Sequence, residues 1–182
     1  MHADTIRTER LVLRELRPED AMQLHRNCSS DPAVVQYLER DVCYDPKVTR
    51  EAVLEWIDMY NLDFFFLLAI EYEGQVIGTI NLHGVDRERG RCEIGYSIGS
   101  EWWNMGIMTE AAGAVVNYVL DDLGFRRITG WCAAENKASA RVMEKIGMKL
   151  EGCMKESILL SSGDWADQLW YAIERDDGEE TE

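Results

Sequence analysis

Proline is scarce in this sequence, with three residues in 182, and no segment is rich in proline or serine. The chain therefore shows no linker of the kind that separates domains, and we expect one domain over residues 1–175. The last seven residues, 176–182, include five acidic side chains, which predicts a disordered acidic tail.

Long apolar runs are also lacking. The longest, residues 64–70, has seven residues, whereas a membrane-spanning helix needs about 20. The first ten residues are polar and do not have the apolar centre of a secretory signal. We therefore expect no membrane segment.

Basic residues are too few to balance the acidic ones: 19 lysines and arginines stand against 34 carboxylates, which gives a net charge of −15. Such a charge disfavours nucleic acid or an anionic membrane surface as the main partner. It favours a cationic partner.

Cysteine and histidine are few and scattered. The five cysteines form no C-x-x-C pair, and the three histidines have no metal-ligand spacing with one another or with cysteine. An odd number of scattered cysteines disfavours a disulfide framework and favours a reduced, cytoplasmic setting. We expect no bound metal.

Hydrophobic periodicity predicts alternating helices and strands. The element order is β-α-α-β-β-β-α-β-α-β-β, and the strands from 64 to 98 form an antiparallel meander around a turn at Glu73-Gly74. The expected strands are residues 10–16, 64–72, 75–85, 91–98, 126–133, 149–159 and 165–174. The first expected helix begins at Pro18, and the others span residues 46–60, 109–123 and 139–146.

Residues 97–109 join a strand to a helix through a loop with glycines at 99 and 106. The start of a helix offers unpaired N–H groups and the positive end of a dipole, which suit a phosphate. Glycine lets the backbone approach a ligand closely. Taken alone, this pattern is more typical of an ordinary connection, because joints of a strand, a glycine loop and a helix are common.

Four motifs in this order along the chain resemble the GNAT superfamily of N-acetyltransferases. Residues 93–96 (EIGY) resemble the family's central strand, 103–111 (WNMGIMTEA) its cofactor loop, and 136–148 the segment that closes the cofactor site. Residues 163–171, with Gly163, Asp167 and Tyr171, resemble the branch that acetylates the N-terminal alanine or serine of ribosomal proteins.

This resemblance implies an α/β fold of the GNAT type, a mixed twisted sheet with helices on both faces. Its strands 91–98 and 126–133 would splay to admit the pantetheine arm of acetyl-CoA, the cosubstrate. The implied activity is acetyl transfer to a primary amine, and a homodimer is common in the branch. The implied cofactor-binding residues are Ile98, Trp103, Asn104, Met105, Gly106, Ile107, Met108, Thr109 and Asn136.

Two positions depart from the family pattern. Met108 stands where a small residue normally lets the diphosphate approach, so its side chain either points into the core or weakens cofactor binding. Met143 stands where many members have a tyrosine as general acid. Ser139 occupies the place that the ribosomal branch uses for a serine facing the thiol.

The chemistry of the acceptor sets what the catalytic residues must do. At pH 7, deprotonating an α-amino group costs about 1.4 kcal/mol and a lysine about 4.6 kcal/mol, so a modest base suffices for the former. Glu93 is the expected base and Ser139 the expected hydrogen-bond donor to the leaving thiolate. Alternatively, Glu93 is a solvated strand residue, and Ser139 or Asn136 only caps a helix.

The expected acceptor is the α-amino end of a basic protein or peptide, with ribosomal proteins first. Polyamines, aminoglycosides and other small amines are alternative acceptors. A non-catalytic, regulatory domain that binds acyl-CoA is the alternative from another class, and it is supported only by Met108 and the missing tyrosine.

Overall fold

The computed structural model describes residues 4–38, 42–62 and 65–175. The predicted acidic tail, residues 176–182, lies outside them. The described chain forms a mixed sheet with the strand order β1-β2-β3-β4-β5-β6-β8-β7. Its strands are β1 (Ile6–Arg7), β2 (Leu11–Arg14), β3 (Phe66–Tyr72), β4 (Gln75–Asp86), β5 (Arg91–Ile98), β6 (Arg127–Ala133), β7 (Lys149–Leu159) and β8 (Trp165–Glu174).

Five α-helices accompany the sheet in the described residues: α1 (Ala21–Leu24), α2 (Pro32–Val35), α3 (Pro46–Met59), α4 (Ile107–Asn117) and α5 (Lys137–Lys145). A 3-10 turn (Pro18–Asp20) leads into α1, and π-helical turns extend α1 (His25–Ser29) and α4 (Tyr118–Asp122). None of the helices formed by the described residues has the length and apolar character to cross a membrane.

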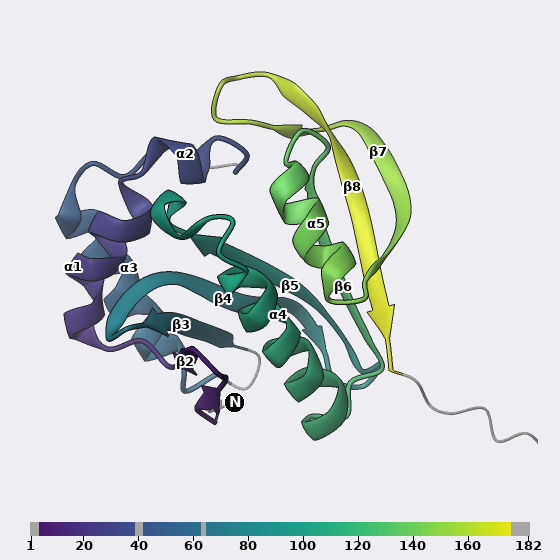
Figure 1. The fold of residues 1–182 in the computed structure, drawn as a ribbon, viewed down its shortest axis with the longest axis horizontal. Helices are drawn as coiled ribbons and strands as arrows, with labels where there is room; N and C mark the ends of the chain where they lie inside the picture. Colours follow the sequence, from purple (N-terminus) through teal and green to yellow (C-terminus); the bar gives the residue numbers. More distant parts are fainter. Residues whose placement is uncertain (1–3, 39–41, 63–64, 176–182) are drawn as a thin grey trace, which may run out of the picture.

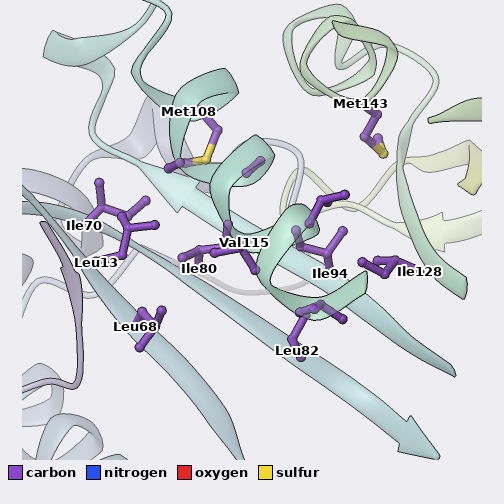
Figure 2. Close-up of a cluster of buried hydrophobic side chains, with 14 of the residues drawn as sticks. Leu13, Leu68, Ile70, Ile80, Leu82, Ile94, Met108, Val115, Ile128 and Met143 are labelled. Atoms are coloured by element: carbon purple, nitrogen blue, oxygen red, sulfur yellow. The ribbon is translucent and has the colours of Figure 1, made fainter. Parts of the chain in front are cut away.

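Helices cover both faces of the sheet. Successive strand residues point to opposite sides, so each strand contributes to both of the resulting cores. On β3, Phe66 and Leu68 belong to the larger core, which also contains buried residues of α4 and α5. Leu67 and Ala69 alternate with these residues and belong to the second core, which contains buried residues of α1 and α3. Figure 1 shows α4 and α5 on one side of the sheet, and Figure 2 shows the larger core. The expected GNAT-type arrangement of helices on both faces is confirmed.

The sheet divides between β5 and β6. The meander β3-β4-β5 is antiparallel, as predicted, and its first turn has Glu73 at φ 49° and Gly74 at φ 75°. β5 and β6 are parallel and pair at only three positions, the last of which joins Glu93 to Thr129. Beyond this pair the two strands diverge, which confirms the predicted splay.

Two helices begin two residues earlier than the sequence predicted. α4 begins at Ile107, because Gly106 adopts the left-handed conformation (φ 75°) and forms its N-cap. α5 begins at Lys137, because the Asn136 side chain accepts a hydrogen bond from the Ser139 N–H at 3.1 Å. Asn136 is therefore the N-cap, and Ser139 lies inside the helix. The short elements β1 and α2 were not predicted.

Candidate active site

The chain from β5 to α4 forms a tightly packed loop. A Cβ atom on Gly99 would lie 1.8 Å from the carbonyl oxygen of Asn27, so only glycine fits there. The Trp103 indole donates a hydrogen bond to the carbonyl of Ile98 at 3.0 Å and folds the loop back on the strand. Gly106 then begins α4 with no side-chain cap. The first N–H groups of α4 are thus available to an anionic ligand.

The start of β2 fixes this loop from the other side. The Arg10 guanidinium donates to the Met105 carbonyl at 3.0 Å and forms an ion pair with Glu110, in the first turn of α4, at 2.7 Å. Glu110 also accepts hydrogen bonds from the Thr8 hydroxyl (2.6 Å) and the Arg10 N–H (2.9 Å). Although burial opposes its charge, these bonds hold the pKa of Glu110 below its usual value. No motif or periodicity in the sequence indicates this contact, because the two residues are 100 positions apart.

A cavity of about 500 Å³ opens beside the loop. Its walls come from the end of β5, the loop and start of α4, the start of α5, and α2. Asp31 links two of these walls, because its carboxylate caps α2 through the Ala33 N–H (2.9 Å) and accepts a hydrogen bond from the Ser100 N–H (3.1 Å). Despite partial burial, these hydrogen bonds lower the pKa of Asp31.

Most of the residues predicted to bind acetyl-CoA meet at this cavity. Met105 is the exception, since its side chain is 44% exposed and only its carbonyl takes part in the loop. Ser139 also lines the cavity, whereas Glu93 is not among the described residues that do. The predicted cofactor residues along the wall are Ile98, Trp103, Asn104, Gly106, Ile107, Met108, Thr109 and Asn136.

Met108 is buried, with 7% of its surface exposed, and belongs to the larger core (Figure 2). Of the two orientations that the sequence left open, this is the one toward the core. Met143 is also a core residue, at 1% exposed, and offers no hydroxyl.

The hydroxyl groups of Tyr96, on β5, and Ser139, on α5, are in contact. The Tyr96 hydroxyl lies 3.0 Å from the Ser139 Oγ and donates to the Ser139 carbonyl at 3.2 Å. Both residues line the cavity. Burial raises the pKa of Tyr96 above its usual value. The sequence left open whether Tyr96 packs or lines a groove, because its partner is 43 residues away.

Glu93 lies at the closed end of the splay. Its Oε1 accepts a hydrogen bond from the Trp131 indole at 2.8 Å and lies 3.3 Å from the His83 Nε2. Its side chain is 19% exposed, so the carboxylate is held in place while keeping access to solvent. The sequence analysis did not identify Trp131 as a partner of Glu93. Glu93 pairs with Thr129, and Trp131, two residues after Thr129, points to the same face of the sheet. Among the described residues, no group of three or more His, Cys, Asp or Glu side chains is arranged to hold a metal ion.

Comparison with known proteins identifies the family. Residues 10–149 match the model of the acetyltransferase (GNAT) domain. The chain is 30% identical over 156 residues to the uncharacterized N-acetyltransferase p20 of Bacillus licheniformis, covering 84% of this chain and 86% of the relative. It is 29% identical over 172 residues to the ribosomal protein uS5-alanine N-acetyltransferase of Escherichia coli, covering 91% and 88%.

A solved structure agrees with this result. The GNAT-family acetyltransferase from Bacillus anthracis superimposes with a TM-score of 0.82 at 31% identity, covering 94% of this chain and 98% of that one. The family match spans the end of β5, the loop, the start of α4 and the start of α5, which all line the cavity. The protein therefore belongs to the GNAT family and is an acetyl-CoA-dependent N-acetyltransferase.

Proposed function

We propose that the acceptor is the α-amino group of a basic protein or peptide, with ribosomal proteins first, and that Glu93 removes its proton. The observation that carries this proposal is the position of Glu93 at the last paired position of β5, where the strands begin to diverge. Acetyl-CoA bound with its diphosphate at the start of α4 would extend its pantetheine arm along the open part of β5. The acetyl group would then end near Glu93.

In this arrangement the loop and α4 hold the donor. The N–H groups after Gly106 bind the diphosphate, because a helix start attracts anions. Asn104, Ile107, Thr109 and Asn136 shape the wall around it. The unpaired edge of β5 beyond Glu93 supplies N–H and C=O groups to the pantetheine amides and an N–H to the oxyanion.

The reaction then needs two proton-handling groups. Glu93, directly or through water, takes the proton as the amine nitrogen attacks the thioester carbon. The C–S bond breaks and its electron pair goes to sulfur, where the Ser139 hydroxyl donates a hydrogen bond. The proton taken from the amine finally resides on the thiol of CoA, so the products are the acetylated amine and free CoA.

Three considerations favour the α-amino end of a basic protein, and the first of them disfavours lysine. An α-amine has a pKa of about 8, against about 10.4 for lysine, so a carboxylate suffices as its base. The net charge of −15 attracts cationic partners. The E. coli relative is named for acetylating the alanine of a ribosomal protein, and the similarity extends over 91% of this chain.

A competition assay tests the acceptor. A basic peptide with a free N-terminus, the same peptide with a blocked N-terminus and an internal lysine, and spermidine are offered at equal concentration with acetyl-CoA. We expect the free N-terminus to be acetylated preferentially. Preference for the blocked peptide or for spermidine would overturn the proposal on the acceptor.

Repeating the competition at two salt concentrations tests the contribution of charge. If the acidic protein attracts the basic peptide over a distance, kcat/KM falls as the ionic strength rises. A flat response would remove the argument from net charge and leave the other two in place.

A further inference from the structure

The contact between Tyr96 and Ser139 crosses the space into which β5 and β6 diverge. Tyr96 belongs to β5 and Ser139 to the first turn of α5, and both line the cavity. The phenol oxygen lies 3.0 Å from the Ser139 Oγ and 3.2 Å from the Ser139 carbonyl oxygen. Two hydroxyls and one carbonyl thus form a small hydrogen-bonded group on the wall of the cavity.

A serine can stabilise a leaving thiolate only if its hydroxyl hydrogen points to the sulfur. Its hydroxyl carries one proton, which rotates freely between acceptors. When that proton points to the phenol oxygen, it is not available to the sulfur. Met143, one turn further along α5, offers no second donor because its side chain is apolar and buried.

We propose that Tyr96 is a positioning residue, whose phenol donates a hydrogen bond to the Ser139 Oγ and so directs the Ser139 hydroxyl to donate its own hydrogen bond to the sulfur of CoA. The inference rests on the proposed role of Ser139 as donor to the leaving thiolate. In the free protein the phenol proton has the Ser139 carbonyl as an acceptor. When acetyl-CoA binds, the phenol proton turns to Oγ and Ser139 turns to the sulfur.

The proton balance of this step is simple. As the C–S bond breaks, its electron pair goes to sulfur, and the Ser139 O–H hydrogen bond stabilises the negative charge. Tyr96 keeps its proton throughout, since it only donates a hydrogen bond. Burial, which raises the pKa of the phenol, keeps Tyr96 neutral and therefore a donor.

A double-mutant cycle tests this coupling. Tyr96→Phe, Ser139→Ala and the double variant are compared in single-turnover acetyl transfer, with acetyl-CoA affinity and Tm measured for each. We expect Tyr96→Phe to slow transfer about fivefold with unchanged acetyl-CoA affinity. In the Ser139→Ala background the same change should cost nothing further, because Tyr96 acts through Ser139.

Tyr171→Phe is the matched control. Tyr171 is buried at 3% exposed, and its hydroxyl contacts Glu144 of the same helix α5 at 3.4 Å, so the variant also removes one phenol oxygen from this region. We expect its transfer rate to equal that of the wild type. Equal slowing in Tyr171→Phe and Tyr96→Phe would overturn the proposal, as would losses that add in the double variant.

A second measurement does not depend on how well Tyr96→Phe folds. Fluorotyrosine at position 96 keeps the ring and hydroxyl but ionises at lower pH, and an ionised phenol cannot donate. We expect the loss of transfer rate at high pH to begin at lower pH than in the wild type. Cys132 and Tyr171, whose pKa values are raised by burial, are titratable groups that influence the phenol, and they are the same in both proteins.

The outcomes separate this inference from the proposed function. An unchanged pH profile with fluorotyrosine would overturn the role of Tyr96. A wild-type rate in Ser139→Ala would overturn the role of both hydroxyls while leaving acetyl transfer itself intact. Failure of the wild type to acetylate any α-amine would instead contradict the proposed acceptor.

Discussion

Glu93 combines fixed geometry with access to the acceptor. The Trp131 indole and His83 both approach its Oε1, while about a fifth of its side chain stays exposed (19%). An oriented carboxylate at the closed end of the splay is suited to take a proton from an amine that arrives from solvent. The role of Glu93 can be separated from its packing, because glutamine retains the oxygen that accepts from Trp131.

Glu93→Gln should therefore slow acetylation of a peptide α-amine about 100-fold at neutral pH. With a pKa of about 8, most of the amine is protonated at pH 7 and must lose its proton, but at pH 9 it is mostly neutral. The loss should shrink as pH rises over this range, as measured by kcat at each pH. Glu174→Gln removes a carboxylate that pairs with Arg127 on β6 and should follow the wild type. A loss of constant size at all pH values would contradict the base role.

Met108 shows how a departure from the family pattern is accommodated. Its side chain is packed in the larger core, with 7% of the residue exposed, although Met108 also contributes to the wall of the cavity. We expect Met108→Ala to destabilise the protein by about 2–5 kcal/mol, because it leaves a cavity in the core. Thermal unfolding measures this, with Met22→Ala, at an exposed site (51%), as the control. An unchanged Tm together with tighter acetyl-CoA binding would contradict this placement.

Among the elements, strands were predicted most accurately. β5, β7 and β8 have the predicted bounds, since polar turns with glycine, residues 86–90 and 161–164, separate them from their neighbours. The starts of α4 and α5 were placed two residues late, because a left-handed glycine and an asparagine side chain define them. The four-residue α2 is too short for a periodic signal, and the Asp31 cap and its contact with Ser100 hold it against the loop.

The candidate site was also predicted in part. The loop and the start of α5 were predicted because the family motifs mark them, and their residues do line one cavity. The partners of Glu93 and of the Met105 carbonyl were not predictable. Trp131 lies 38 residues from Glu93, and Arg10 lies 95 residues from Met105, so only the folded sheet brings them together.

The contact between Arg10, just before β2, and the loop before α4 gives a prediction about how these elements support each other. Arg10→Met removes the donor to the Met105 carbonyl and the cation paired with Glu110, which keeps only its hydrogen bonds from the Thr8 hydroxyl and the Arg10 N–H. The negative charge of Glu110 is then less compensated at the start of α4, where we propose that the diphosphate binds. We expect acetyl-CoA to bind about tenfold more weakly, at a cost of about 1.4 kcal/mol, with little change in kcat. Binding is measured by calorimetry. Arg89→Met, at an exposed turn arginine that pairs with Asp86, is the control. Unchanged affinity in Arg10→Met would show that the loop holds its shape without the arginine.

In the whole molecule, the function depends on one break in an otherwise continuous sheet. β5 and β6 pair only up to Glu93 and Thr129, and the space beyond is bordered by α4, α5 and the loop between β5 and α4. The cavity, where we propose that acetyl-CoA binds, lies beside this break, and Glu93 lies at its closed end. The homodimer implied by the family resemblance stays a prediction.

The most direct test of the account is to locate the transferred acetyl group. A basic peptide with a free N-terminus and an internal lysine is incubated with the protein and isotope-labelled acetyl-CoA, and the product is sequenced by tandem mass spectrometry. We predict one labelled acetyl group on the first residue and none on lysine, with labelling about 100-fold slower in Glu93→Gln at neutral pH. Label on the lysine, or an unlabelled peptide, would contradict this prediction.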